Sequence, residues 1–320
     1  METILIGTYT RKTSEGIYRI ELNKESEKLE NLSLVAKTEN PTYLEYNDKT
    51  NELLAVYQDG EEGGIALWNY QDKLASLKET ITQTGVQPCF VHYNAKNNEF
   101  YDANYHRGEV HVYQDGALKE TFKYDEGAHA HYVHTDHKTN ALFTVDLGND
   151  EIHKYVDLKE VSSFKTAENA GPRHIAFHPS ASYLYIMTEY SNEVIVLKDG
   201  EDLELIQTIS TLPEAVKSDG AAIRMTSDGK FVYVSNRGHD SITVFKVNDD
   251  YTLSFVQNIS SYGEHPRDFN LSKDEAYVVV ANRDTNNLVL YRRDVNTGEL
   301  TMLSSDTAVQ EPVSLIFINE

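Results

Sequence analysis

A short motif returns seven times along this chain of 320 residues. Each copy places aromatic or apolar residues just after a proline or a small residue. The copies begin at Pro41, Pro88, Ala130, Pro172, Gly220, Pro266 and Pro312. They are separated by 47, 42, 42, 48, 46 and 46 residues, and five of the seven prolines in the chain occupy this position. A period in this range is typical of solenoids and propellers, so residues 1–320 are expected to form a single domain of equivalent units.

Each repeat contains four short runs that have the character of β-strands. In the fourth repeat these runs are HIAFHP, YLYIMTE, EVIVLK and LELIQTI, with turn-forming residues between them. Such runs indicate strands joined by hairpins. Four antiparallel strands in a unit of this length predict a blade of an all-β, seven-bladed β-propeller. The last copy stops after one strand, and the start of the chain supplies the missing runs. Both termini are therefore expected to close the seventh blade, which removes a free sheet edge.

Composition and charge narrow the range of partners and compartments. The net charge of -22 opposes binding to nucleic acid, whose phosphates need a basic surface, and to anionic membranes. A single cysteine, Cys89, excludes an internal disulfide and fits a reducing compartment. No apolar run approaches the roughly 18 residues of a membrane span, and no signal peptide is recognised. We expect a cytoplasmic protein, and a monomer, because a closed ring needs no partner to fold.

Charged and titratable residues recur at one end of the predicted channel. In a propeller blade the first strand lines the channel, and the start of that strand lies beside the end of the antiparallel second strand. These two positions carry the following side chains in blades three to six: His131, Asp146, Arg173, Glu189, Asn236, Arg237, Arg267, Asn282 and Arg283. Arginine binds carboxylates and phosphates bidentately, and histidine or glutamate can take a proton from water. The cluster predicts a hydrolytic site for an anionic substrate.

Other interpretations of the same residues remain open. Glu189 could simply pair with Arg173, and Asn or Asp at a strand end favours a turn. Oxygen ligands from Asn104, Asp146 and the equivalent asparagines would suit a hard cation such as Ca²⁺. The hydrolytic scheme requires neither a metal nor another cofactor, and none is predicted.

Several long segments resemble a known family. The opening IGTYT and the segments HAHYVHTDHKTNALFTVDLGNDEI, GPRHIAFHPSASYLYIMTEYSNEV and VYVSNRGHDSITVF resemble the cytoplasmic lactonase family of seven-bladed propellers. That family includes 6-phosphogluconolactonases of the propeller type and carboxymuconate cyclases. The resemblance covers the whole chain, with HAH where HPH is more usual. It implies a catalytic set of His131, Arg173, Glu189 and Arg237, four of the residues that the channel positions also select.

The resemblance and the cluster together predict a lactonase that acts on a small anionic lactone. The leading substrate is 6-phospho-D-glucono-1,5-lactone, opened to 6-phosphogluconate in the pentose phosphate pathway. Glu189 or His131 is the expected general base, while Arg173 and Arg237 stabilise the oxyanion or hold the anionic group. Residues expected to contact substrate are Arg267, Asn236, Asn282, Arg283 and Asp146. The alternatives are a lactonase or cycloisomerase for a muconolactone or an unphosphorylated sugar lactone, and a non-catalytic propeller that binds a protein.

Overall fold

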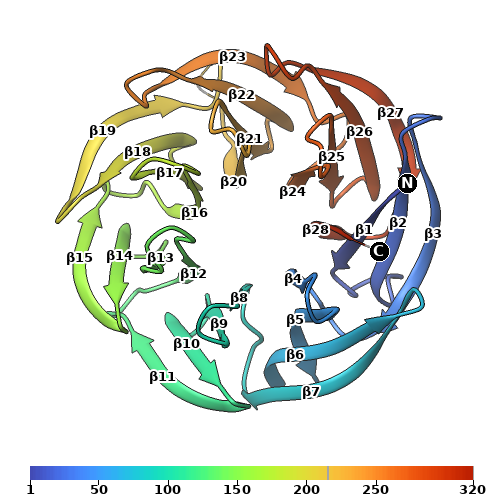
Figure 1. The fold of residues 1–320 in the computed structure, drawn as a ribbon, viewed down its shortest axis with the longest axis horizontal. Coiled ribbons are helices and arrows are strands. Elements are labelled where there is room, and N and C mark those ends of the chain that lie inside the picture. Colours follow the sequence, from blue (N-terminus) through green and yellow to red (C-terminus); the bar gives the residue numbers. More distant parts are fainter. Residues whose placement is uncertain (215, 320) are drawn as a thin grey trace.

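Seven four-stranded antiparallel sheets stand around a central axis like the blades of a propeller (Figure 1). The computed structural model describes residues 1–214 and 216–319. The arrangement confirms the predicted all-β propeller with four strands per blade. None of the described segments forms a helix of the length and hydrophobicity needed to span a bilayer.

The strands fall into four concentric sets, counted outward from the channel. The innermost set is β4 (Leu44–Asn47), β8 (Phe90–Asn94), β12 (Ala130–Thr135), β16 (Pro172–Phe177), β20 (Asp219–Met225), β24 (Pro266–Leu271) and β28 (Pro312–Ile318). The second set is β1 (Glu2–Thr8), β5 (Glu52–Asp59), β9 (Glu99–Asn104), β13 (Leu142–Asp146), β17 (Tyr183–Thr188), β21 (Phe231–Arg237) and β25 (Tyr277–Asn282).

The two outer sets complete each blade. The third set is β2 (Gly16–Asn23), β6 (Glu62–Gln71), β10 (Glu109–Gln114), β14 (Glu151–Val156), β18 (Glu193–Asp199), β22 (Ser241–Val247) and β26 (Asn287–Arg293). The outermost set is β3 (Lys28–Lys37), β7 (Leu74–Thr84), β11 (Ala117–Lys123), β15 (Lys159–Lys165), β19 (Leu203–Ser210), β23 (Leu253–Ser260) and β27 (Leu300–Ala308).

The two ends of the chain share one blade. Its strand order is β28-β1-β2-β3, so the last strand supplies the channel-facing position and the first strand pairs with it. The register runs from Thr3 opposite Ile318 to Thr8 opposite Pro312. Figure 1 shows the N- and C-termini close together beside β1 and β2. This confirms the predicted closure by both termini.

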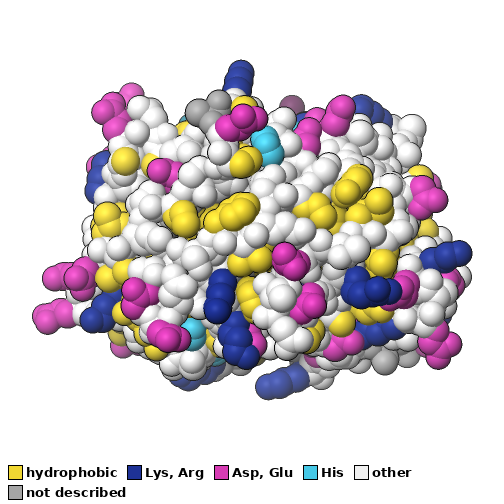
Figure 2. Space-filling view, turned by 90° about the horizontal axis from the view of Figure 1, so that it is seen from above, with side chains coloured by type: hydrophobic (Ala, Val, Ile, Leu, Met, Phe, Trp, Pro, Cys, Tyr) yellow, Lys and Arg dark blue, Asp and Glu magenta, His cyan; other side chains and the backbone are white. Residues whose placement is uncertain are grey.

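Burial follows the distance of a strand from the channel axis. Every residue of β21 and of β25 is buried, because these second strands pack between neighbouring blades. The outermost strands alternate between exposed and half-buried residues, as in β7. Acidic and basic side chains are mixed with apolar ones on the side wall that these strands form (Figure 2). The inner and second strands are therefore the rigid part of the molecule, and they support the channel mouth.

Candidate active site

Three functional candidates lie at irregularities of the innermost strands. The pairing of β12, β16 and β24 with the next strand skips one residue just after the start of each strand. The skipped residues are His131, Arg173 and Arg267. A bulge leaves its extra residue out of the hydrogen-bonded ladder and redirects its side chain. The repeat therefore presents these three side chains at the same end of the channel.

The ends of two second strands bring further charges to this place. Glu189 directly follows β17, and its backbone N–H donates to the carbonyl of Gly171 over 2.6 Å. Arg237 is the last residue of β21 and pairs with Asp219. The predicted neighbourhood between inner-strand starts and second-strand ends is thus observed.

A cavity of about 350 Å³ opens at this end of the channel. Its volume is within the range of small-molecule sites. It is lined by Tyr9, Arg11, Asn40, Thr42, Val86, Gln87, Pro88, Cys89, Tyr105, His106, His131, Glu189, Arg237 and Arg267. Three of these residues are arginines and only one is acidic, although the whole chain carries a net charge of -22. The cavity lining therefore carries more positive than negative charge, in contrast to the chain as a whole.

Glu189 joins two buried arginines: Arg237, which lines the cavity, and Arg173, which lies behind the lining residues. Its Oε2 lies 2.9 Å from Nε of Arg173 and 2.8 Å from a terminal nitrogen of Arg237. Arg173 also donates to the carbonyl of Ala221 over 2.7 Å, and Arg237 donates to that of Gly220 over 2.7 Å. These contacts hold both guanidinium planes in place.

The cluster carries more positive than negative charge. Burial, together with the charges of Arg237 and Arg267, lowers the pKa of Arg173 to about 9. Burial alone would raise the pKa of Glu189, but the guanidinium groups around it lower that pKa below its usual value. Arg173 thus stays cationic and Glu189 anionic at neutral pH. One carboxylate faces several guanidinium groups, so the cluster keeps an excess of positive charge. An anionic group of the substrate can neutralise that charge.

His131 is held as a neutral imidazole beside these cations. Its residue is 5% exposed, and its Nδ1 is buried without a hydrogen-bond partner. Burial and then the charges of Arg173, Arg267 and Arg237 lower the pKa of His131 well below its usual value. The ring lies edge-on to Tyr105, with centroids 6.1 Å apart. A neutral imidazole that lines a cavity can accept a proton from water.

Arg267 differs from Arg173 and Arg237 in its surroundings. It is half-buried and lines the cavity. Within residues 1–214 and 216–319, no carboxylate forms an ion pair with it; its recorded neighbour is the ring of Tyr9, 5.8 Å from its Cζ. A guanidinium in such a position can bind an anion without first breaking an ion pair.

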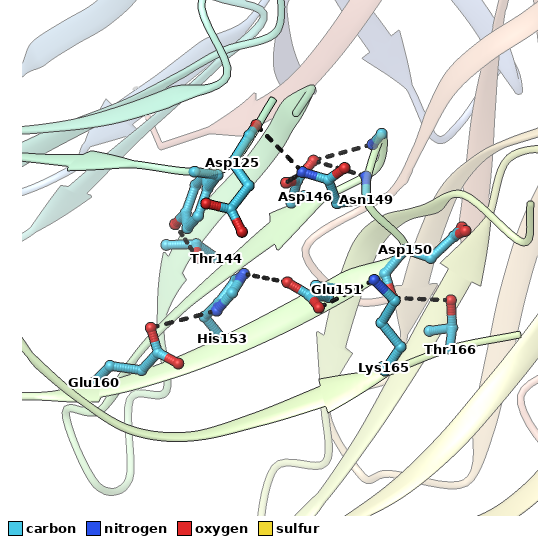
Figure 3. A network of polar contacts seen from close by, with 12 residues as sticks. Asp125, Thr144, Asp146, Asn149, Asp150, Glu151, His153, Glu160, Lys165 and Thr166 are labelled. Carbon is cyan, nitrogen blue, oxygen red and sulfur yellow. Dashed lines mark hydrogen bonds and ion pairs between the residues drawn. The ribbon is translucent and has the colours of Figure 1, made fainter. Parts of the chain in front are cut away.

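The remaining predicted residues lie elsewhere. Asp146 is fully buried and accepts hydrogen bonds from the backbone of its own turn and from Asn149, as Figure 3 shows. Asn236 accepts a hydrogen bond from Thr211, and Asn282 donates to the carbonyl of Ser261. These three side chains hold turns together and are not part of the cavity lining. They serve different blades, so their oxygens do not converge on one point.

Arg283 is also outside the cavity lining. Its Nε lies 2.6 Å from a carboxylate oxygen of its neighbour Asp284. The same acidic residue lies 3.7 Å from Nδ1 of His265. The charge of Arg283 is therefore already compensated at the rim. Across the described parts of the chain, no group of three or more His, Cys, Asp or Glu residues is arranged to hold a metal ion.

The structure adds cavity residues that the repeat alignment did not select, chiefly Tyr9, Arg11 and His106. Thr8 pairs with Pro312 as Thr188 pairs with Pro172, so Tyr9 is the seventh-blade equivalent of Glu189. The signal was present in the sequence. It was hidden because the first and second strands of this blade are at opposite ends of the chain.

Comparison with known proteins places the chain in a family. Residues 3–317 match the model of the family described as "Lactonase, 7-bladed beta-propeller". The chain belongs to this lactonase family. It is 40% identical over 342 aligned positions to the 6-phosphogluconolactonase of Bacillus subtilis, and the alignment covers 98% of each chain.

Several solved structures superpose on nearly the whole chain. A protein from Lactobacillus plantarum aligns with a TM-score of 0.96 at 36% identity and covers 100% of both chains. A candidate 6-phosphogluconolactonase from Bacteroides fragilis aligns with a TM-score of 0.90 at 29% identity and covers 99% of this chain and 98% of its own. The fold and the family therefore agree with the sequence-based prediction, and a lactone is a plausible substrate by homology.

Proposed function

We propose that this protein hydrolyses 6-phospho-D-glucono-1,5-lactone to 6-phosphogluconate. The observation that carries the proposal is a cationic cavity, with one carboxylate and one neutral imidazole, in an acidic chain. The relation to the 6-phosphogluconolactonase of Bacillus subtilis supports the same reaction.

His131 is the proposed general base. A water oxygen attacks the lactone carbonyl carbon while the imidazole takes one of the water's protons. The bond between the carbonyl carbon and the ring oxygen then breaks, and the imidazolium returns the proton to the ring oxygen. The products are a carboxylic acid, which releases its proton to the solvent at neutral pH, and a hydroxyl group. No external acid or cofactor is consumed. The low pKa of His131 in the free protein keeps its imidazole neutral, which is the form that can accept a proton.

Arg173 and Arg237 are proposed to stabilise the negative charge that develops on the carbonyl oxygen. Both are fixed by Glu189 and by backbone carbonyls before substrate arrives. Donors that need no reorganisation are the most effective stabilisers of an oxyanion. Glu189 thus acts in this scheme as a positioning residue for the two guanidinium groups.

Substrate charge adjusts the strength of the base. In the free protein three arginines lower the pKa of His131. An anion bound near these arginines offsets their field, so the pKa of the imidazole rises in the complex. A base with a higher pKa accepts a proton from water more readily. As the pH is lowered, we therefore expect kcat to begin to fall at a higher pH than kcat/KM does.

The test is the rate at which the phosphorylated lactone disappears above its spontaneous hydrolysis. The wild-type protein should accelerate hydrolysis with and without EDTA, and His131→Asn should lower kcat by about a hundredfold or more. His137→Asn is the matched control, because His137 is exposed and lies outside the cavity. No acceleration by the wild-type protein, or an unchanged kcat in a folded His131→Asn variant, would refute the proposed reaction or the proposed base, respectively.

A further inference from the structure

Two arginines lie against the same aromatic ring at the cavity mouth. Cζ of Arg11 is 4.0 Å from the ring centroid of Tyr9, and Cζ of Arg267 is 5.8 Å from the same centroid. All three residues line the cavity. Contacts of this length are attractive because a guanidinium is drawn to the face of an aromatic ring. Tyr9 therefore contacts two positively charged side chains that line the same cavity.

Neither arginine has a carboxylate partner in the described residues 1–214 and 216–319. Arg173, Arg224 and Arg237, in contrast, are each paired with an acidic side chain. Arg11 is exposed and Arg267 is half-buried. Two cations that line one cavity repel each other, and partial burial strengthens that repulsion. An anion bound within reach of both guanidinium groups would offset this repulsion.

The two arginines stand at different depths relative to the reacting groups. Arg267 is half-buried and is among the charges that lower the pKa values of His131, Arg173 and Arg237, whereas Arg11 is exposed and is not among the main causes of these shifts. Arg267 therefore lies toward the proposed catalytic cluster, and Arg11 lies farther out. A ligand with a reactive ring at one end and an anionic group at the other would fit this order.

The backbone that carries Arg11 is fixed by neighbouring blades. The N–H groups of Tyr9 and Lys12 donate to the backbone carbonyl and the side chain of Glu311 over 3.0 Å and 2.8 Å. Thr10 and Asn40 exchange two hydrogen bonds of 3.1 Å each. These hydrogen bonds fix the backbone on both sides of Arg11. The side chain of Arg11 therefore starts from a defined place on the rim of the cavity.

We propose that Arg11 and Arg267, packed on Tyr9, form a phosphate-binding subsite that selects phosphorylated sugar lactones over unphosphorylated ones. The inference rests on the proposed function for the identity of the lactone. A phosphate monoester carries a charge of about -1.5 to -2 at pH 7, which matches two unpaired guanidinium groups. Arg283 is not part of this subsite, because it is paired with Asp284 and does not line the cavity.

Binding of the product tests the subsite without requiring turnover. Calorimetry would compare 6-phosphogluconate with gluconate on the wild-type protein and on Arg11→Gln. The wild-type protein should bind 6-phosphogluconate at least about tenfold more tightly than gluconate. Arg11→Gln should lose most of this preference. Arg292→Gln is the matched control, because Arg292 pairs with Glu27 on the outer part of a blade and lies outside the cavity.

The possible results separate the subsite from the reaction. Equal binding of the two acids by the wild-type protein, or an unchanged preference in a folded Arg11→Gln variant, would overturn the subsite. A preference that depends on Arg11 would support the subsite even if no lactone were hydrolysed, and the proposed reaction alone would then fall. The melting temperature of Arg11→Gln should match that of the wild-type protein, because the side chain is exposed.

Discussion

Two buried histidines and one half-buried histidine should make this propeller less stable in mild acid. Burial, followed by nearby positive charges, lowers the pKa values of His131, His134 and His174 well below 6.5. In the unfolded chain the same rings titrate near 6.5. Below that pH the unfolded chain binds protons that the folded protein does not bind. The free energy of unfolding therefore falls as the pH drops through 6.5.

The size of this effect follows from proton linkage. Between pH 7.5 and 5.5 each ring that stays neutral only in the folded state costs about 1.4 kcal/mol. Three such rings remove about 4 kcal/mol, a large share of a typical stability of about 5–15 kcal/mol. His111 acts in the opposite direction: burial would lower its pKa, but Asp102 and Glu109 raise it overall. Its stabilising contribution grows as the pH falls. Burial also lowers the pKa of His178 and, to about 3, the pKa of His265. Both add to the loss, so we expect a net loss of about 4–5 kcal/mol.

Denaturant unfolding of the wild-type protein and of His134→Phe at pH 7.5, 6.5 and 5.5 measures this loss. The His134 ring stacks on His92 with centroids 3.7 Å apart and lies 5.6 Å from the ring of Phe177, so phenylalanine suits the site. The variant should lose about 1.4 kcal/mol less than the wild-type protein over this range. His137→Phe, at an exposed position, should behave like the wild type. Equal stability of the wild-type protein at all three pH values would refute the reasoning.

Three further changes probe the cavity and its support. Glu189→Gln leaves two buried guanidinium groups without their anion, which should lower the free energy of unfolding by about 3–5 kcal/mol. Added 6-phosphogluconate should then raise the melting temperature of this variant more than that of the wild-type protein. A methyl group at Gly220 would lie 2.1 Å from the carbonyl oxygen of Thr188, so Gly220→Ala should lower the melting temperature, whereas Gly200→Ala at an open turn should not. Burial raises the pKa of Cys89 to about 12, so iodoacetamide at pH 8 should alkylate it at least about a hundredfold more slowly than a free thiol; equal rates would show that the thiol is not protected.

The repeat made most of the fold predictable from the sequence. Its period defined the units, and the incomplete last copy indicated how the ring closes, because Pro312 begins a strand that has no partner of its own. Aligned positions also selected His131, Arg173 and Glu189, which the structure brings together. Those side chains could be found because a propeller places equivalent residues at one end of the channel.

Side-chain direction was not predictable in the same way. Asn236 and Asn282 share the strand-end position with other candidates, yet their amides turn inward and satisfy backbone or hydroxyl groups of nearby turns. Short polar side chains satisfy local groups more readily than they reach a ligand. Tyr9 and Arg11 were missed because their blade is divided between the two ends of the sequence. A contact that joins residues 300 positions apart leaves no trace in a local pattern.

The shared blade has a consequence during protein synthesis. Ribosomes produce the chain from β1 onward at about 5–20 residues per second, so β1 and β2 are complete long before β28 exists. Until then the channel-facing edge of β1 has no strand to pair with and can attract other unpaired edges. The loop that carries Arg11 also lacks its hydrogen bond to the side chain of Glu311 until that residue has been synthesised. The subsite proposed above would therefore be completed only after Glu311 has been synthesised.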